Sequence, residues 1–305
     1  MLKQILNFKN DTQKIMMMVI LSILPAVIFK VYTFGFLGLL SLLTLVITAL
    51  VTEKVLAKVL NIKDDLADYT SLITAILLFM SLNCNMSFFV YFIASVVSIG
   101  LGKMVYGGFA KNIFNPAMVG WCFIMLSFPQ YMTKHIDPTT SLNLIESLKV
   151  FFAFNNVDSL TQATPLTQYK LEGGFSAVQS LAIINLLTLA GGLFLVAKKV
   201  ITPIFPIAMF VGLIFSSFLF NYDMATSLQA FGLYGPFILA AFYIITDPVS
   251  SPSLPRAQAF YSFAIAFVAV LIAKFGVYPV GIAFAVVFMN SFNFILDKLF
   301  NKGAK

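Results

Sequence analysis

Long apolar runs separated by short polar breaks recur along the chain of 305 residues. A helix needs about 20 apolar residues to cross the hydrocarbon core of a bilayer. The runs predict ten transmembrane helices, at about 15–30, 33–51, 69–82, 86–101, 113–128, 178–197, 201–220, 228–246, 258–275 and 278–296. We therefore expect an all-α, polytopic membrane protein with two five-helix halves, 1–128 and 178–305, joined by an external loop over 129–177.

Two of these runs are short for a full crossing and open with polar or helix-breaking residues. They are the third, "YTSLITAILLFMSL", and the fifth, "IFNPAMVGWCFIMLSF". The ends of the two halves also resemble each other weakly, in "NIFNPAMVGWCFIM" and "YPVGIAFAVVFMN". Lipid tolerates interrupted helices only where protein or a cavity lines them, and duplicated halves often meet at a central polar site. The pattern predicts broken helices around such a site.

Composition and charge agree with a membrane protein and suggest its orientation. Sixty percent of the residues are hydrophobic and ten percent are charged, which excludes one water-soluble core. No small-residue cleavage site follows the first apolar run, so we expect the first helix to remain. With both termini in the cytoplasm, 14 lysines and arginines fall on the inner side and five on the outer side, Lys30, Lys134, Lys149, Lys170 and Lys274. This bias follows the positive-inside rule.

The net charge of +7 is therefore explained by the membrane topology of the chain. We expect no nucleic-acid partner, because no basic cluster with interleaved aromatic residues is present. On this topology the long loop between the fifth and sixth helices lies outside the cytoplasm. A loop of that length is longer than a helix hairpin needs and is usually functional or disordered.

A threonine-rich stretch in this loop, "NNVDSLTQATPLTQYK", contains a candidate attachment motif. The residues Asp158-Ser159-Leu160-Thr161-Gln162-Ala163-Thr164 resemble the signal at which a flavin transferase joins FMN to the last threonine through a phosphoester. The hydroxyl of Thr164 would be the attachment point, and Asp158, Ser159, Thr161 and Ala163 the rest of the motif. An ordinary threonine-rich turn is the alternative interpretation of the same letters.

Three further stretches carry a resemblance over most of the chain. They are "YGGFAKNIFNPAMVG", "ITDPVSSP" and "GVYPVGIAFAVVFMN". They are similar to motifs shared by the D subunit of the Rnf ferredoxin:NAD oxidoreductase complex and the B subunit of the sodium-translocating NADH:quinone oxidoreductase. The short segment before the first helix favours the Rnf protein, and the quinone-reductase protein stays as the alternative.

The resemblance implies a fold, cofactors and partners. The fold would be related to urea transporters, which opens a second alternative, a urea- or ammonia-like solute channel with a continuous polar path. The cofactors would be covalent FMN and a second, non-covalent riboflavin. The partners would be membrane and iron-sulfur subunits of a redox-driven ion pump in the bacterial cytoplasmic membrane, with a flavin transferase needed for maturation.

Polar residues at the ends of the broken helices are candidates for an ion path. They are Asp68, Asn115, Asp247 and Asn290, and they suit simple helix capping equally well. All twelve carboxylates are expected in loops or at helix ends, and Val280 stands where relatives often carry an acid. The valine argues against a cation route through that point, and the sequence leaves Na⁺ and H⁺ coupling open.

The remaining chemistry is sparse. Cys84, Cys122 and His135 lack the clustered spacing of a metal or iron-sulfur site. No Walker loop or dinucleotide fingerprint occurs, so we expect the NAD and ferredoxin chemistry to lie on other subunits. We expect no complete active site on this chain alone.

Overall fold

A computed structural model describes residues 2–62, 68–136, 142–152, 161–165, 167–168 and 178–301. Within these ranges it does not describe the side chains of residues 2–11, 135, 161 and 162. Three residues of the predicted attachment motif, Asp158, Ser159 and Leu160, lie outside the described residues.

The described chain is helical apart from two strands of three residues each. The elements of the first half and the loop are α1 (Leu2–Val59), α2 (Thr70–Ser81), α3 (Phe88–Gly100), η2 (Met104–Tyr106), α4 (Pro116–Ser127), α5 (Pro129–Met132), β1 (Lys134–Ile136), α6 (Leu144–Phe151) and β2 (Thr161–Ala163). The second half contains α8 (Gln179–Ala197), α9 (Ile204–Leu219), α10 (Met224–Ser227), η4 (Leu228–Leu233), α11 (Phe237–Leu239), η5 (Ala240–Ile244), α12 (Pro255–Phe275), α13 (Ile282–Asn290) and α14 (Asn293–Asn301).

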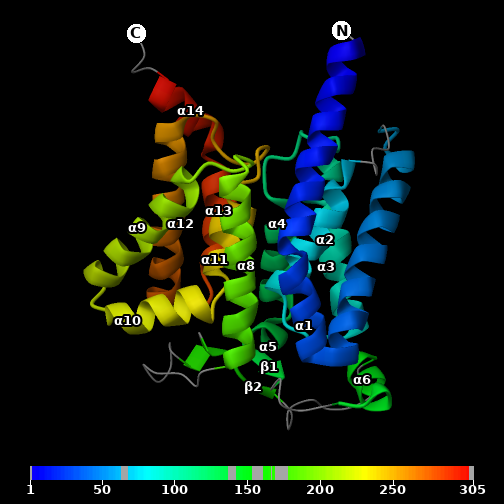
Figure 1. Ribbon diagram of the computed structural model, residues 1–305. Coiled ribbons are helices and arrows are strands. Elements are labelled where there is room, and N and C mark those ends of the chain that lie inside the picture. The colour runs from blue at the N-terminus through cyan, green and yellow to red at the C-terminus, as the bar shows by residue number, and fades with distance from the viewer. Residues whose placement is uncertain are drawn as a thin grey trace.

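Each of the ten predicted apolar segments falls on one helix or on two or three consecutive helical elements. Among the described residues, four helices are long and apolar enough to cross a membrane, or up to six if each bent pair counts as one span. One of the four, Thr12–Val59, is interrupted at Gly35, where φ is 55° and ψ is −133°. Glycine adopts this left-handed φ without a steric penalty. The two arms of α1 therefore run in opposite directions (Figure 1) and match the first two predicted helices.

The sequence correctly predicts two short helices, α2 and α4, which have twelve residues each. At about 1.5 Å of rise per residue, each is only about 18 Å long. The eighth and tenth predicted helices differ from the expectation, because both are bent: η4 meets α11 at 67°, and α13 meets α14 at 57°. Gly235 and Pro236 lie in the first break, where proline cannot donate a backbone hydrogen bond.

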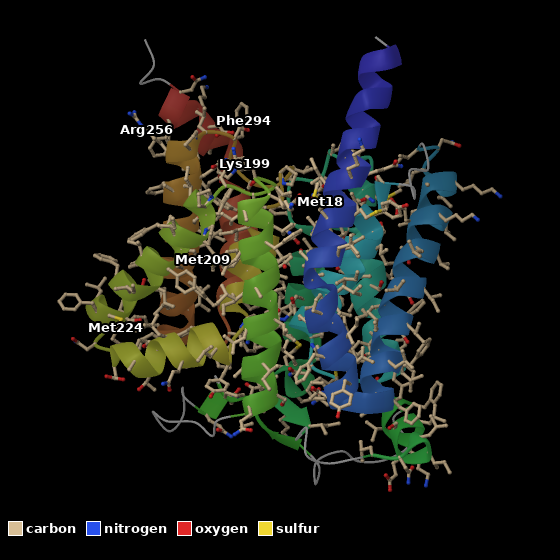
Figure 2. The ribbon with its side chains drawn as sticks, in the orientation of Figure 1. Met18, Lys199, Met209, Met224, Arg256 and Phe294 are labelled. Carbon is tan, nitrogen blue, oxygen red and sulfur yellow. The ribbon has the colours of Figure 1, made fainter. Side chains whose placement is uncertain are left out.

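Both chain ends lie on one side of the helices, and the strands lie on the other (Figure 1). The basic residues Lys199 and Arg256 lie at the same end of the molecule as the chain termini, while Met224 lies toward the opposite end (Figure 2). This arrangement agrees with the relative placement that the charge pattern predicts. We call the two ends the termini side and the loop side.

The two halves pack closely at α8. A Cβ atom on Gly191 would lie 2.1 Å from the carbonyl oxygen of Ser22 and 2.4 Å from the hydroxyl oxygen of Tyr243. The Ser22 and Tyr243 hydroxyl oxygens are themselves 3.1 Å apart. Only glycine fits here, because α8 lies directly against α1 and η5 and leaves no room for a side chain.

Candidate functional site

Two cavities lie between the halves, one toward each side. The termini-side cavity has a volume of about 190 Å³ and is lined by residues of α1, α2, α4, α8, η5 and the loop after η5. The loop-side cavity has a volume of about 120 Å³ and is lined by residues around the ends of α2, α8 and the broken helix. Three of the ion-path candidates lie in or directly beside the first cavity, and Thr164 lines the second.

Asn115 and Asn290, 175 residues apart in the sequence, meet beside the termini-side cavity. Asn115 is the N-cap of α4: its side-chain oxygen accepts from the amide of Met118 at 3.3 Å, and its side-chain nitrogen donates to the carbonyl of Ile244 at 3.2 Å. The side-chain oxygen of Asn290 accepts from the Asn115 backbone amide at 3.1 Å. Its nitrogen donates to the Ser250 carbonyl and the Tyr261 hydroxyl, both at 2.7 Å. Both side-chain amides are engaged, which fits capping and cross-linking of the halves.

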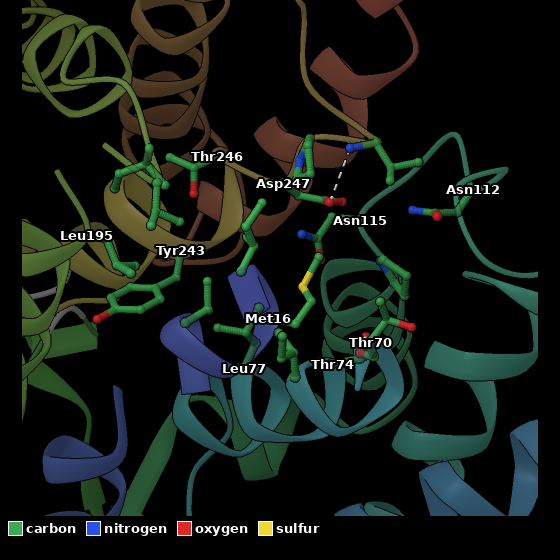
Figure 3. A pocket seen from close by; sticks show the side chains of 18 of the residues that line it. Met16, Thr70, Thr74, Leu77, Asn112, Asn115, Leu195, Tyr243, Thr246 and Asp247 are labelled. Carbon is green, nitrogen blue, oxygen red and sulfur yellow. Dashed lines mark hydrogen bonds between the residues drawn. The ribbon is translucent and has the colours of Figure 1, made fainter. Parts of the chain in front are cut away.

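Asp247 lines the same cavity and lies beside Asn115 (Figure 3). The loop carboxylate is half-buried and accepts hydrogen bonds from the Ser250 hydroxyl at 2.7 Å and the Val249 amide at 3.3 Å. Burial raises the pKa of the Asp247 carboxyl above its ordinary value, against the opposing effect of these hydrogen bonds. A carboxylate therefore faces the cavity at a place where a cation or proton could bind.

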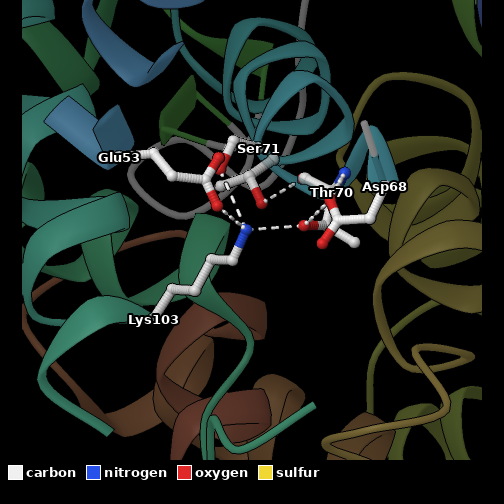
Figure 4. A network of polar contacts seen from close by, with 6 residues as sticks. Glu53, Asp68, Thr70, Ser71 and Lys103 are labelled. Carbon is white, nitrogen blue, oxygen red and sulfur yellow. Dashed lines mark hydrogen bonds and ion pairs between the residues drawn. The ribbon is translucent and has the colours of Figure 1, made fainter. Parts of the chain in front are cut away.

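Asp68 does not join these three residues but belongs to a second polar cluster (Figure 4). Its carboxylate accepts from the Thr70 hydroxyl at 2.6 Å and the Thr70 amide at 2.8 Å. The Lys103 ammonium donates to the same Thr70 hydroxyl oxygen, to Ser71 and to the carboxylate of Glu53. Glu53, Asp68 and Lys103 are each at most 3% exposed. Among the described residues, one carboxylate oxygen of Glu53 and one of Asp68 have no hydrogen-bond partner.

The Glu53–Lys103 pair is absent from the sequence-based predictions, and it corrects one expectation. The hydropathy pattern places Glu53 beyond the second helix, but α1 continues to Val59 and buries it. The sequence does contain a feature that points to this pair. Glu53 and Lys103 each lie two residues after the end of a predicted helix, and both ends are predicted on the same side of the membrane. Their pairing depends on how α1 and α3 are brought together, which the sequence pattern does not encode.

On the loop side, residues 161–163 of the predicted attachment motif form one of two antiparallel strands. β2 pairs with β1 in a register that places Ala163 opposite Lys134 and Thr161 opposite Ile136. The next residue, Thr164, donates its amide to the Thr133 carbonyl at 3.0 Å. Its half-buried hydroxyl lies 2.7 Å from that of Thr167 and accepts from the Thr167 amide at 3.3 Å. These hydrogen bonds fix the hydroxyl of Thr164, which lines the loop-side cavity.

The loop-side cavity combines apolar walls with a few polar groups. Trp121, Leu239 and Pro165 supply apolar surface, and Asn185 and Lys30 supply polar groups. Asn185 donates to the carbonyls of residues 233 and 235, which the break before α11 leaves without helical partners. A mostly apolar pocket with a few placed polar groups is the usual form of a cofactor site.

Lys30 also differs from its predicted place. The charge count assigns it to an outer segment, but it lies within α1 and is 5% exposed. Its amino group donates to the carbonyls of Phe79, Met80 and Leu82 at the end of α2. Positive-inside counting does not distinguish a lysine that caps a neighbouring helix from one in an exposed loop.

Comparison with known families matches residues 5–304 to the family described as NQR2, RnfD, RnfE. The chain belongs to this family. It is 34% identical to a protein of Buchnera aphidicola subsp. Schizaphis graminum over 94% of this chain and 92% of the relative. It is also 34% identical to proteins of Actinobacillus succinogenes, over 92% of this chain and 89% of the relative, and of Pectobacterium atrosepticum, over 92% and 91%. All three relatives are named as the D subunit of an ion-translocating oxidoreductase complex. The resemblance found in the sequence is confirmed.

Proposed function

We propose that the chain is the D subunit of an Rnf-type ion-translocating oxidoreductase complex in the bacterial cytoplasmic membrane. The family match over residues 5–304 and the shared name of the relatives support this assignment.

We propose ten spans in a urea-transporter-like arrangement, with both termini in the cytoplasm and Thr164 outside. The ten helical segments and the placement of the basic residues support that arrangement.

We propose that Thr164 carries FMN through a phosphoester. The observation that carries the proposal is that Thr164, the threonine predicted from the motif, lines a cavity between the halves. The residues present fit the group: Thr164 lines the cavity together with apolar residues and with Asn185 and Lys30. Bound FMN would accept and donate electrons one at a time, and the protein would set its position and potential.

The chain's own residues have separable tasks in this proposal. Thr164 supplies the oxygen of the phosphoester, and the pairing of β1 with β2 fixes the backbone that carries it. Trp121 and Leu239 would exclude water from the cavity behind it. On the termini side, the proposed contacts for Na⁺ or H⁺ are Asp247, Asn115, Asn290 and Asp68, which binds the cavity-lining Thr70. The proposed second flavin, riboflavin, has no assigned position.

The two alternatives have less support. The two cavities share no lining residue, so neither of them alone is the continuous polar path that a solute channel needs. The quinone-reductase alternative has the same family match in its favour, while the relatives compared above carry the name of the D subunit.

In-gel fluorescence tests the attachment site. The full chain is coexpressed with a flavin transferase, denatured and illuminated with ultraviolet light, because a phosphoester survives denaturation and a flavin held only by contacts does not. We expect a fluorescent band for the parent and none for Thr164→Ala. Thr167→Ala is the matched control, since it removes the neighbouring hydroxyl 2.7 Å away and should leave the band fluorescent.

Asp158→Ala should weaken the band if the transferase reads the whole motif. A fluorescent Thr164→Ala band, or a dark parent band, would overturn the attachment site. Rapid urea or ammonia conduction by flavin-free chain in liposomes would favour the channel instead.

A further inference from the structure

Lys30 carries a buried amino group that the proposed attachment site does not by itself require. It lies in the first arm of α1, five residues before the break at Gly35. Its Nζ atom donates to the carbonyl oxygens of Phe79 at 2.7 Å, Met80 at 3.2 Å and Leu82 at 2.8 Å. These carbonyls end α2, where the last turn leaves backbone acceptors without helical partners. Lys30 therefore satisfies a helix end inside the protein.

The number of acceptors indicates the form of the amino group. A neutral amine has two N–H groups, whereas an ammonium has three, and three carbonyls lie within hydrogen-bond distance. In the part of the chain that the structure describes, no carboxylate pairs with Lys30. The end of α2 offsets only about half an elementary charge. A net positive charge therefore remains in the wall beside α2.

This charge borders the cavity that holds the proposed attachment site. Lys30 and Thr164 both line the loop-side cavity, together with Met80 and Leu82 from the capped end of α2. Most of the remaining lining is apolar, including Trp121. Because apolar surroundings screen charges weakly, a fixed cation in this wall acts on whatever charge develops in the cavity.

We propose that Lys30 stabilises negative charge on the flavin carried by Thr164 and so makes that flavin easier to reduce. The proposal rests on the function proposed above. Full reduction of the isoalloxazine ring takes two electrons, and when one proton accompanies them the ring keeps one negative charge. The electrons come from the other redox carriers of the complex, or from dithionite in the test, and the proton comes from water.

The test separates the charge of Lys30 from its capping role. Lys30→Gln keeps N–H donors for the α2 carbonyls and removes the charge, Lys30→Met removes both, and Lys30→Arg keeps both. The full chain is coexpressed with the transferase, purified in detergent and titrated with dithionite while the flavin absorbance is followed. We expect a lower midpoint potential for Lys30→Gln and Lys30→Met, and a potential near the parent value for Lys30→Arg.

A second perturbation does not touch Lys30. Ser81 lines the same cavity, and Ser81→Asp places a negative charge in its wall. This variant should also lower the midpoint potential, so the proposal remains testable if Lys30→Gln does not fold. Ser81→Ala is its matched control and should leave the potential unchanged.

The outcomes distinguish this proposal from the one on which it rests. A parent band without in-gel fluorescence overturns both. A fluorescent parent whose midpoint potential is unchanged in Lys30→Gln, or unchanged in Ser81→Asp where the glutamine variant does not fold, overturns the role of Lys30 alone. A loss of thermal stability in Lys30→Met without any potential shift in Lys30→Gln would assign Lys30 to helix capping only.

Discussion

Replacing Lys103 by methionine removes the ammonium that Glu53, Thr70 and Ser71 share. The side chains of Lys103 and Glu53 are only 3% and 4% exposed, so water cannot replace the lost partner. Removing one member of a buried ion pair typically costs about 3–5 kcal/mol, because the remaining charge stays buried. Here the Glu53 carboxylate would lose the ammonium that donates to it. The neighbouring Asp68 carboxylate already has one oxygen without a hydrogen-bond donor among the described residues. We therefore expect Lys103→Met to lower the free energy of unfolding by about 3–5 kcal/mol.

A double-mutant cycle isolates the pair. Glu53→Gln removes the carboxylate charge but leaves Lys103 its bonds to two hydroxyls. We expect this change to lower the free energy of unfolding by about 1–3 kcal/mol. The double variant leaves neither charge of the pair, and its loss should be smaller than the sum of the single losses by about 2 kcal/mol or more.

Thermal unfolding of the detergent-solubilised variants, followed by size-exclusion chromatography of heated samples, measures these differences. Lys54→Met is the matched control, because Lys54 is the next residue of α1 and is exposed. Surface substitutions away from special features change stability little, so this control should unfold at the parent temperature. If Lys103→Met unfolds at the same temperature as Lys54→Met, or if the single losses add, the cluster does not hold α1, α2 and the end of α3 together.

Two further predictions concern the joint between the halves and the orientation. Asn290→Ala leaves the Asn115 amide, the Ser250 carbonyl and the Tyr261 hydroxyl without their partner, so we expect a loss of about 3 kcal/mol or more in the same thermal assay. Its control, Ser291→Ala at the exposed neighbour, should unfold at the parent temperature, and equal melting of the two variants would contradict the role of Asn290. A cysteine introduced at Thr140 should react with a membrane-impermeant reagent added from outside the cell, while tags at both termini should be reachable only from the cytoplasm. Labelling of Thr140→Cys only after the inner face is opened would reverse the orientation.

The hydropathy pattern predicts the helices because the length of an apolar run is a local property that the bilayer thickness constrains. It also predicts the shortness of α2 and α4, since polar or helix-breaking residues open both runs. Gly235 and Pro236 are themselves helix-breaking residues. They lie inside a continuous apolar run, however, so the hydropathy pattern predicts one unbroken helix there.

The contacts of the site are less predictable. Asn115 and Asn290 are each recognisable as polar residues at helix ends, yet their hydrogen bond joins positions 175 residues apart. The burial of Lys30 depends on the packing of α1 against the end of α2, and nothing in its local sequence separates it from a loop lysine. Thr164 is identified from a short motif, whereas its place at a cavity depends on the positions of both halves.

The closeness of the two cavities has an electrical consequence. On α2, Leu77 lines the termini-side cavity and Met80 lines the loop-side cavity, and three residues of helix span about 4.5 Å. On the broken helix, Phe242 and Leu239 are also three residues apart in the sequence. With water in both cavities, before a flavin occupies the loop-side cavity, most of the membrane voltage would drop across this thin layer. A charge that crosses it would then gain or lose nearly the whole of about 2.3 kcal/mol per 100 mV within a few ångströms.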